Sequence, residues 1–486
     1  MNQRLFGGVL ALSITVLVIS NILRGDFMLA GASVVLFLAP MIAHPDRFWM
    51  ATIITLGSGI SFSVTGDASL HLLLMLCFII FIIMKLAISN RQSIQTSVPR
   101  KVCIALLSLI VITAFYRGWG LRILDGTTWG GMQYVNLIAA LFFYLFSYYV
   151  TITQKQLERT IRWLFVLSLI PAAGCLLVHF MPSMKWIENV VPMEKNEQQW
   201  QASEGVRWAA MQSSAIWMGI LALLIYDRRT KFTFVVVLVS VLSFIMLGLS
   251  GHRAVAVLLG LIIFVYIFVK RREARLFQFL KLAGVMIILV TIIYIFVGEL
   301  PRTFQRAFAW LPGINVSYEA GMDASNTSEW RIELWRQLIP MIPDYLWIGR
   351  GLAFSQIEAQ SASVLASDVG TQHLYFTAVH LYHNGPLLLV LDLGLFGFAL
   401  GLGFMLSGIV HYGRLSRRIL GGSGWNTAYI VFYSFFVGDC IFFLTVFGAV
   451  APLCVIFILA AILEVIVRSS EVADRNRTSE VESGTH

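Results

Sequence analysis

The chain has 486 residues, of which 58% are hydrophobic and only 13% charged, and its formal net charge is +9. Its mean hydropathy is +0.80, and apolar runs of about 17 to 25 residues, long enough to span a bilayer, recur along it. A soluble globular protein is excluded, because soluble helices and strands keep polar faces at periods of about 3.6 or 2 residues. A closed barrel is disfavoured, since membrane-spanning strands alternate apolar and polar residues. The sequence predicts an all-α polytopic membrane protein.

The apolar runs predict about 12 to 14 transmembrane helices, about 11 of them before residue 298 and about three after residue 384. Residues 299–383 between the two groups are expected to form a periplasmic loop domain with amphipathic helices, and residues 469–486 a disordered cytoplasmic tail. In chain order the predicted spans are 6–23, 27–43, 48–64, 69–88, 102–115, 132–152, 163–181, 209–226, 232–249, 254–269, 280–297, 386–412, 425–446 and 449–467.

Lys and Arg residues between the predicted spans set the orientation, because cytoplasmic loops are enriched in them. All the basic clusters fall on one side of the membrane, which places both termini in the cytoplasm and the long loop in the periplasm. The first apolar run lacks an Ala-x-Ala-like cleavage site and is expected to be a retained helix. The net positive charge is expected to meet anionic membrane lipids, not nucleic acid. The clusters comprise Arg4, Arg47, Arg91, Arg100, Lys101, Lys155, Arg159, Arg228, Arg229, Lys231, Lys270, Arg271, Arg272, Arg275, Arg414, Arg417, Arg418, Arg468, Arg475 and Arg477.

Arg253 follows the tight turn Ser250-Gly251-His252 at the outer membrane boundary. It is either a headgroup anchor or a clamp for a lipid-linked phosphate or diphosphate, since a guanidinium bonds phosphate oxygens in a bidentate manner. Arg207, which begins the preceding outer segment, is a candidate of the same kind. The polar residues 212–214 after it face either a wet cavity or a helix-packing contact.

The loop of roughly 85 residues is far longer than a typical connection. It carries five arginines on the side of the membrane where basic residues are otherwise rare, so they need another partner, and an anionic group is the simplest one. We interpret the loop as the active-site cap of a membrane enzyme. Arg331, Arg336 and Arg350 are candidates for binding the anion, whereas Arg302 and Arg306 are expected to contact lipid headgroups.

An amphipathic helix is predicted inside this loop. Asn326 to Glu329 form a capping-box-like start, and apolar residues follow at helical spacing until Pro340 and Pro343 end the helix. Lying on the membrane surface, the helix is expected to bury its Trp and Leu face in the interfacial layer and to turn Arg331 toward the covered site. Arg336 either binds substrate or pairs with Glu333, which contributes little. The apolar stripe comprises Trp330, Leu334, Trp335, Leu338 and Ile339.

Three histidines, His373, His380 and His383, precede the first span after the loop. A metal site is not favoured, because no acidic or cysteine ligand accompanies them at a familiar spacing, and the five cysteines are expected to be small core residues. His383 precedes a helix start marked by Pro386, whose free N–H groups and partial positive charge suit an anion. There it is expected to act as a general base toward an attacking hydroxyl or to orient the substrate.

Together these motifs resemble the bacterial O-antigen ligase and O-antigen polymerase superfamily. The resemblance covers residues 207–403 and rests on the arginine after the Ser-Gly-His turn, the segments Arg331-Ile-Glu-Leu-Trp-Arg and Ile348-Gly-Arg-Gly-Leu, and His383-Asn-Gly-Pro before a Gly-rich span. It implies a metal-independent, inverting glycosyltransferase of the C-type membrane architecture in the bacterial inner membrane. Its donor would be a glycan linked to undecaprenyl diphosphate at the periplasmic face, and its acceptor a glycan, a lipid or a protein.

The resemblance maps the turn arginine, the loop arginine and the loop-end histidine of the family onto Arg253, Arg331 and His383, the expected catalytic residues. The arginines would neutralise the diphosphate leaving group without a metal or cofactor, and the histidine would activate or position the acceptor hydroxyl. The chain departs from the commonest family pattern at His252, where many members carry serine, which leaves the role of His252 open. The residues expected to bind substrate around these three are Arg207, Arg336, Arg350, His380 and Asn384.

Two other classes of protein fit part of the pattern. A transporter or flippase for a lipid-linked oligosaccharide would also need outer arginines, and it predicts ionisable residues in mid-span, for which Asp392 and Asp439 are candidates. A non-catalytic assembly protein would not require Arg331 and His383 to converge. Between polymerase and ligase, the long loop favours a polymerase.

Overall fold

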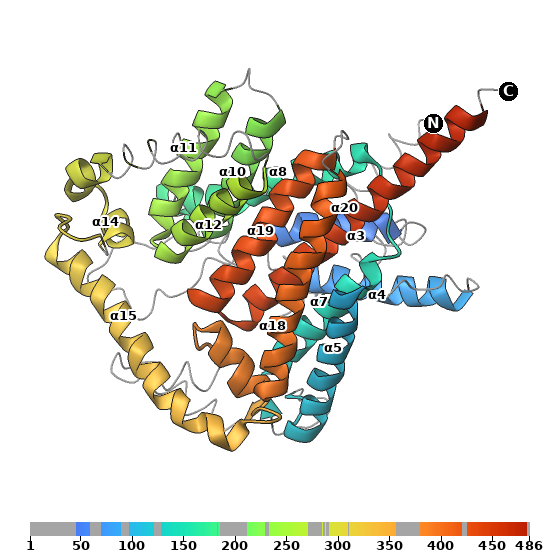
Figure 1. Cartoon of the computed structure of the whole chain (residues 1–486). Coiled ribbons are helices and arrows are strands. Elements are labelled where there is room, and N and C mark those ends of the chain that lie inside the picture. The colour runs from blue at the N-terminus through green and yellow to red at the C-terminus, as the bar shows by residue number, and fades with distance from the viewer. Residues whose placement is uncertain are drawn as a thin grey trace.

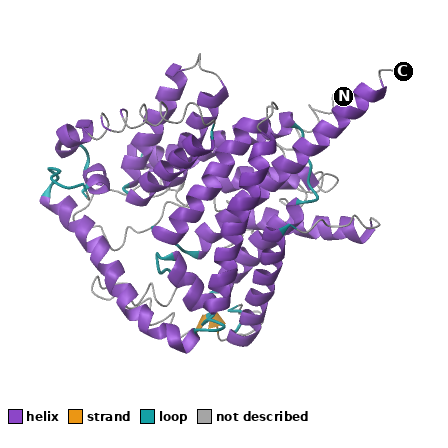
Figure 2. Ribbon diagram, in the orientation of Figure 1, coloured by secondary structure: helices purple, strands orange, loops and turns teal. Residues whose placement is uncertain are grey.

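The computed structural model describes residues 45–58, 70–88, 97–120, 128–181, 183–184, 211–228, 233–270, 284, 287, 291–309, 311–355, 380–419 and 425–483. These residues fold almost entirely into helices, with one antiparallel pair of two-residue strands at the edge of the helical bundle (Figure 2). Figure 1 shows a bundle of long helices with one helix, α15, running obliquely along its side. The predicted spans 6–23 and 27–43 lie outside the described residues.

The described elements follow the predicted order from residue 45 onward. The later predicted spans overlap described helices, except that only part of the 280–297 span is described. The elements are α3 (Pro45–Ser58), α4 (Leu70–Ile88), α5 (Val98–Arg117), β1 (Thr128–Trp129), α7 (Gly131–Ser147), α8 (Gln154–Phe180), α10 (Met211–Arg228), α11 (Thr233–Ser250), α12 (Arg253–Val269), η5 (Val297–Glu299), α14 (Arg302–Phe308), α15 (Tyr318–Leu338), η6 (Ile339–Tyr345), β2 (Phe354–Ser355), α18 (Gly385–Ile419), α19 (Trp425–Thr445) and α20 (Val450–Ser483).

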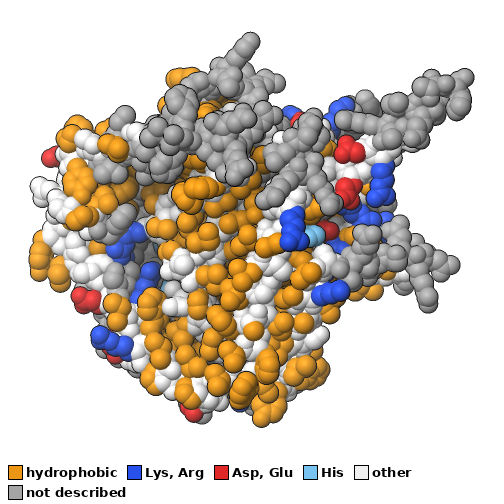
Figure 3. All heavy atoms as spheres, viewed as in Figure 1, with side chains coloured by type: hydrophobic (Ala, Val, Ile, Leu, Met, Phe, Trp, Pro, Cys, Tyr) orange, Lys and Arg blue, Asp and Glu red, His pale blue; other side chains and the backbone are white. Residues whose placement is uncertain are grey.

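The described helices confirm an all-α polytopic membrane protein. Five of them are long and apolar enough to cross a membrane, within α5, α8, α18, α19 and α20, and five shorter apolar helices accompany them. Hydrophobic side chains cover most of the face of the bundle seen in Figure 3. A surface of this kind suits contact with lipid tails.

Helix α19 lies at the centre of the bundle, with 83% of its apolar window buried. Helices α10, α12, α18 and α20 all pack on it. A Cβ added to Gly438 would lie 3.1 Å from Cγ1 of Ile262, so the glycine allows α12 to approach α19 closely. This close packing fixes α12, which begins at Arg253.

Helix α18 is broken at Gly394, whose φ of 74° no continuous helix contains. The N–H of Leu395 donates to the carbonyl of Leu346 (2.6 Å), while the carbonyls of Leu391 and Asp392 accept from the N–H groups of Arg350 (2.8 Å) and Gly351 (3.0 Å). Residues 346–351 thereby supply the partners that an unbroken helix would have provided itself. A broken helix at membrane depth requires such partners, because an unpaired backbone group there is costly.

The same loop is held from two further sides. Nε of Arg117 at the end of α5 donates to the carbonyl of Gly349 (2.9 Å), and the hydroxyl of Tyr134 in α7 accepts from the N–H of Leu352 (2.9 Å). Strands β1 and β2 pair just beyond, with Trp129 opposite Phe354. Arg117, for which lipid headgroup contact is the natural expectation at a helix end, is therefore a contact between α5 and the loop.

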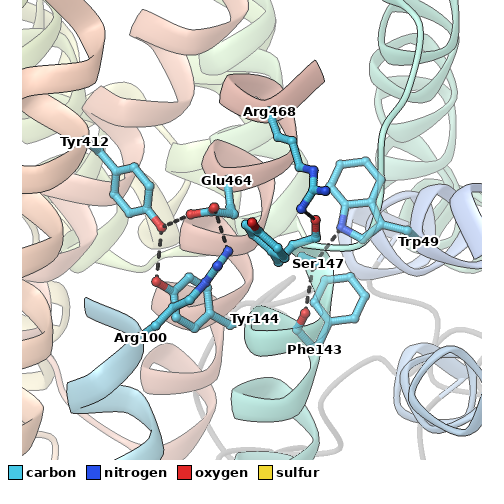
Figure 4. Close-up of polar contacts among 9 residues, drawn as sticks. Trp49, Arg100, Phe143, Tyr144, Ser147, Tyr412, Glu464 and Arg468 are labelled. Atoms are coloured by element: carbon cyan, nitrogen blue, oxygen red, sulfur yellow. Dashed lines mark hydrogen bonds and ion pairs between the residues drawn. The ribbon is translucent and has the colours of Figure 1, made fainter. Parts of the chain in front are cut away.

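A second polar network joins α5, α7, α20 and the part of α18 that follows the Gly394 break (Figure 4). Nη2 of Arg100 lies 2.6 Å from Oε1 of Glu464, and the hydroxyl of Tyr412 lies 3.3 Å from both Oε2 of Glu464 and the hydroxyl of Tyr144. Arg468 of α20 donates to the carbonyl of Tyr148, the residue that directly follows α7. The buried charge of Arg100 is thus compensated inside the bundle.

Two predictions about element boundaries and one about burial are corrected. Helix α15 begins at Tyr318, with Ser317 as N-cap accepting from the N–H of Ala320 (3.3 Å), so residues 326–329 lie inside the helix and form no capping box. Its end before Pro340 is confirmed. Leu334 and Leu338 lie in the protein core and not in an interfacial lipid layer. Helix α20 continues to Ser483, so residues 469–483 are helical where a disordered tail is predicted.

Candidate functional site

Arg253 is placed by the reversal between α11 and α12. Gly251 adopts a left-handed conformation (φ 66°) directly after α11, and its N–H donates to the carbonyl of Gly248 (3.1 Å), which closes that helix. His252 is the N-cap of α12, and Arg253 is its first residue. Nη2 of Arg253 donates to the carbonyl of Ala324 in α15 (3.0 Å). The arginine therefore reaches from the bundle to the helix that lies alongside it.

Arg331 lies in α15, two turns after Ala324, and its guanidinium stands 5.7 Å from the ring centroid of Trp330. Burial lowers the pKa of Arg331 from its ordinary value, and the positive charge of Arg253 lowers it further. The contribution of Arg253, which is smaller than that of burial, places the two guanidinium groups within range of mutual repulsion. Nε of Arg331 is buried and has no hydrogen-bond partner among the described residues.

His383 lies two residues before α18 and adopts a left-handed conformation with φ of 52°. Its ring packs edge-on against Trp330, with centroids 5.2 Å apart, and against Phe447, with centroids 4.7 Å apart. Burial lowers the pKa of His383 to about 3, and the positive charges of Arg331 and His252 contribute to the shift. The imidazole is therefore neutral at pH 7 and keeps a ring nitrogen able to accept a proton.

Arg253, Arg331 and His383 thus converge, and we refer to them together as the arginine–histidine site. They come from three elements that are distant in the chain: the start of α12, the middle of α15 and the turn before α18. Figure 3 shows Lys and Arg side chains gathered between α15 and the start of α12, on a face that is otherwise largely hydrophobic. The site has the positive charge and the partial burial that suit a multivalent anion.

Asn384 caps α18 next to the site. Its Oδ1 accepts from the N–H of Leu387 (3.0 Å), and its carbonyl accepts from the N–H of Leu388 (2.9 Å), so the helix starts at Gly385 as Pro386 predicts. A Cβ on Gly385 would overlap the carbonyl of Phe443, which explains why glycine occupies this position. The side chain of Asn384, expected to bind substrate, holds the helix N-terminus beside His383.

The structure does not bring Arg336 into the site. Its side chain is 73% exposed and lies 3.6 Å from Glu333, one turn earlier on α15. This is the exposed i,i+3 pair that the sequence left open as the alternative to substrate binding. Arg207 lies outside the described residues.

His380 and Arg350 lie beside the site but in a buried environment. His380 is completely buried, and its Nδ1 lies 2.9 Å from Oδ1 of Asp392. Nη2 of Arg350 lies 3.4 Å from Nε2 of His380. Both residues, expected to contact substrate, contact each other and α18 instead. Asp392, a candidate transport residue, is a member of the same cluster.

Arg302 and Arg306 also depart from the expected lipid headgroup contacts. Nη1 of Arg302 lies 3.1 Å from Oε2 of Glu319, an ion pair between α14 and the first turn of α15. Arg306 is buried, with 6% of its surface exposed. Both arginines therefore belong to the packing of α14, which supports the start of α15.

Sequence reasoning missed the aromatic surroundings of His383. Trp330 was assigned to an interfacial stripe, although one of its faces meets His383 and its neighbour in sequence is Arg331. Phe447 carries no local signal, because it lies in the short connection between α19 and α20. His252 offered one signal, its position directly before Arg253.

The apolar helical bundle defines a polytopic membrane protein, in which two arginines and a neutral histidine meet. Residues 238–402, which contain the whole arginine–histidine site, match the family model described as O-Antigen ligase. This match covers about a third of the chain and supports a membrane enzyme of the O-antigen ligase and polymerase type. No curated protein matches the chain.

Proposed function

We propose that the protein is a glycosyltransferase that moves a glycan from an undecaprenyl-diphosphate carrier to an acceptor hydroxyl. The reaction takes place on the periplasmic face of the bacterial inner membrane, needs no metal and inverts the anomeric centre. Arg253, Arg331 and His383 carry it. The membrane bundle suits a donor whose carrier is a long polyprenyl chain, because the chain can stay in the lipid while its diphosphate reaches the site.

The observation that supports this proposal is the convergence of two arginines on one histidine inside the matched family region. Arg253 and Arg331 repel each other, so holding them together without a ligand is unfavourable. A diphosphate would offset this repulsion, and its charge rises further as the bond to the sugar breaks. Charge stabilisation that grows toward the transition state is the kind that accelerates a reaction.

The reaction balances without a further reactant. The acceptor oxygen attacks the anomeric carbon from the face opposite the diphosphate, and the bond between that carbon and the phosphate oxygen breaks. The electron pair of this bond leaves with undecaprenyl diphosphate, whose negative charge Arg253 and Arg331 neutralise. The acceptor proton passes to the ring nitrogen of His383. A single displacement of this kind inverts the configuration.

The depressed pKa of His383 fits this role once the donor is bound. In the free protein burial lowers the pKa of His383, and the neighbouring positive charges lower it further, so the imidazole is neutral and ready to accept a proton. A bound diphosphate offsets the charges of Arg331 and His252, which raises the pKa of His383 and makes it a stronger base. Binding of the donor therefore makes His383 a better proton acceptor for the reaction of that donor.

The experiment that tests this function uses the full-length protein, purified and placed in liposomes with an undecaprenyl-diphosphate-linked glycan. Transfer of glycan and release of undecaprenyl diphosphate are expected without ATP or an ion gradient, and Arg253→Ala, Arg331→Ala and His383→Ala are expected to abolish transfer while leaving the fold intact. Full activity in all three variants contradicts the assignment of the site. Movement of the intact donor across the bilayer with no change in its bonds means a flippase.

The acceptor decides between the two members of the superfamily. We favour a polymerase, whose acceptor is another lipid-linked repeat, because the loop that covers the site is long. Analysis of the glycan in a deletion strain separates the outcomes. Loss of long chains with single repeats retained means a polymerase, whereas accumulation of long lipid-linked chains means a ligase acting on a lipid or protein.

A further inference from the structure

A cluster of three buried polar side chains lies within a few residues of His383 and is not used by the proposed chemistry. His380, Tyr382 and Asp392 are all completely buried. Nδ1 of His380 lies 2.9 Å from Oδ1 of Asp392, and the hydroxyl of Tyr382 donates to the same Oδ1 (2.7 Å) and lies 3.0 Å from Nδ1 of His380. No part of these three side chains is exposed, and the contacts described for them are with other parts of the protein.

The contacts of the cluster fix the arrangement of its protons. A guanidinium has donors and no acceptor, so Arg350 donates to Nε2 of His380 across the 3.4 Å contact. Nδ1 of His380 then carries the ring proton and donates it to Asp392. The imidazole stands between the carboxylate of Asp392, which is completely buried, and the guanidinium of Arg350, which is partly exposed. Both hydrogen bonds to Asp392 go to Oδ1, whereas Oδ2 is buried without a hydrogen-bond partner among the described residues. The bonds to Oδ1 restrain His380 and Tyr382 against α18.

Hydrogen bonds of the cluster fix the conformation of residues 380–383, the segment that carries His383. Both ends of the 380–383 segment, His380 with φ of 59° and His383 with φ of 52°, are left-handed, a conformation uncommon outside glycine. Residues with side chains keep such a conformation only where their surroundings enforce it. Here the enforcing contacts are those of His380 and Tyr382 with Asp392, a residue of the first half of α18.

The same segment is tied to the helix that carries Arg331. Nε1 of Trp335, one turn after Arg331 on α15, donates to the carbonyl of Tyr382 (2.8 Å). One residue, Tyr382, therefore meets α18 through its hydroxyl and α15 through its carbonyl. The two contacts set the separation between His383 and Arg331.

We propose that Asp392, His380 and Tyr382 are positioning residues that hold the imidazole of His383 in its productive orientation against Arg331. The proposal rests on the proposed function, and it replaces the substrate-binding role expected for His380 and Arg350 with an internal one. Supporting groups of this kind typically change turnover about 10- to 100-fold when they are removed. They act on the reacting step and not on donor affinity, which depends on Arg253 and Arg331.

Tyr382→Phe is the most economical variant, because it removes one hydroxyl and keeps the ring. We expect kcat to fall about 10-fold or more while KM for the lipid-linked donor stays within about two-fold. Tyr429→Phe is the matched control: Tyr429 is also completely buried, and its hydroxyl donates to the carbonyl of Tyr412 (2.7 Å), away from the cluster. The control is expected to keep wild-type kcat.

Two variants of His380 distinguish positioning from simple filling of space. In His380→Asn the amide can take the place of Nδ1–H and donate to Asp392, whereas His380→Phe keeps a ring of similar size without a donor. We expect the asparagine variant to retain more kcat than the phenylalanine variant at equal thermal stability. Asp392→Asn, which keeps the shape and removes the charge, is expected to resemble Tyr382→Phe or to be more impaired.

The outcomes are separable from those of the proposed function. If the wild-type protein transfers glycan and Tyr382→Phe and Asp392→Asn turn over normally, the positioning role is overturned and the proposed function stands. An effect on KM alone, with kcat unchanged, also overturns it, because it would make the cluster part of donor binding. If the wild-type protein transfers no glycan in the liposome assay, the proposed function itself fails.

Discussion

The site holds two positive side chains close together, and their repulsion lowers the stability of the folded protein. Arg253 and Arg331 repel each other, as the lowered pKa of Arg331 shows. The protein offsets part of this cost through the carbonyl of Ala324, which accepts from Arg253, and through the ring of Trp330 beside Arg331. A bound diphosphate is expected to offset the remainder.

The two arginines of α15 provide a matched comparison of site and surface. Arg331→Gln is expected to lower glycan transfer by about 100-fold or more, because it removes a cation that faces the leaving group. Arg336→Gln removes an exposed cation five residues later on the same helix, paired with Glu333, and is expected to leave transfer within about two-fold of wild type. Initial rates in liposomes measure both effects. Equal losses of glycan transfer in the two variants would contradict a specific role for Arg331.

The pKa of His383 leads to a dependence of stability on pH. Its ordinary value is 6.5 and its value in the folded protein is about 3. Between these values the unfolded chain binds a proton that the folded protein does not, so stability is lost as the pH falls from about 6.5 toward about 3. This part of the stability is fully present above pH 6.5.

His383→Asn isolates the contribution of this residue, because asparagine tolerates a left-handed conformation and does not titrate in this range. Between pH 7 and pH 5 the wild-type protein is expected to lose up to about 2 kcal/mol more of its free energy of unfolding than the variant. Equilibrium unfolding in mixed detergent micelles at the two pH values measures the difference. Parallel losses in both proteins would mean that His383 titrates normally in the fold.

The arginine–histidine site was predictable from the sequence because its three members carry local signals. Arg253 follows a tight turn between two spans, Arg331 lies on an amphipathic helix, and His383 precedes a helix N-terminus. The buried role of His380 was not predictable, because its partner Asp392 lies in a span and is recognisable only when α18 is known to break two residues later. Three-dimensional contacts decided that role, and no spacing in the chain reports them.

At the scale of elements, α15 and α18 are the two that depart from the pattern of straight membrane helices. In the predicted apolar stripe of α15, Leu334 and Leu338 are buried, but they pack on the protein core where lipid was expected, and Ile339 is 56% exposed. An apolar stripe at helical spacing indicates that one face of the helix is buried, but it does not distinguish burial in lipid from burial in protein. Its start at Tyr318 was missed because the 326–329 segment offers a convincing cap of its own.

The break in α18 gives a prediction about two glycines. Gly394→Ala is expected to lower the free energy of unfolding by about 2 kcal/mol or more, since alanine at φ of 74° is strained and its Cβ would overlap the carbonyl of Trp347. Gly260→Ala in α12 is the control: no atom lies within 4 Å of its added Cβ, and alanine favours the helix. Melting temperatures in detergent should fall for the first variant and hold or rise for the second. A stable Gly394→Ala protein would mean that α18 can run straight.

The whole molecule has two polar centres along α18. One lies at its start, beside His383, and the other lies near Tyr412, where Arg100 and Glu464 meet (Figure 4). The break at Gly394 lies between the two positions. The first centre is rich in unbalanced positive charge, whereas the charges of the second are matched. Only the first has the character of a binding site, and the second has that of a structural joint between helices.

Disrupting the Arg100–Glu464 pair is expected to lower the stability of the protein without changing its rate of glycan transfer. Arg100→Gln is expected to lower the free energy of unfolding by about 3 to 5 kcal/mol, because it leaves Glu464 buried without its cation. Arg162→Gln breaks a second ion pair, with Glu158, whose arginine is 78% exposed, and is expected to change stability by less than about 1 kcal/mol. Denaturant unfolding compares the two, and transfer rates per folded molecule are expected to match wild type. A normal stability for Arg100→Gln would show that the network is dispensable.

The insertion of residues 346–351 into α18 has a consequence for how a bulky glycan gains room at the site. Lifting this segment would strip partners from the carbonyls of Leu391 and Asp392 and from the N–H of Leu395, at several kcal/mol for each group in an apolar setting. The segment is therefore a fixed wall of the enzyme throughout turnover. Room for a bulky sugar must therefore come from other walls of the site.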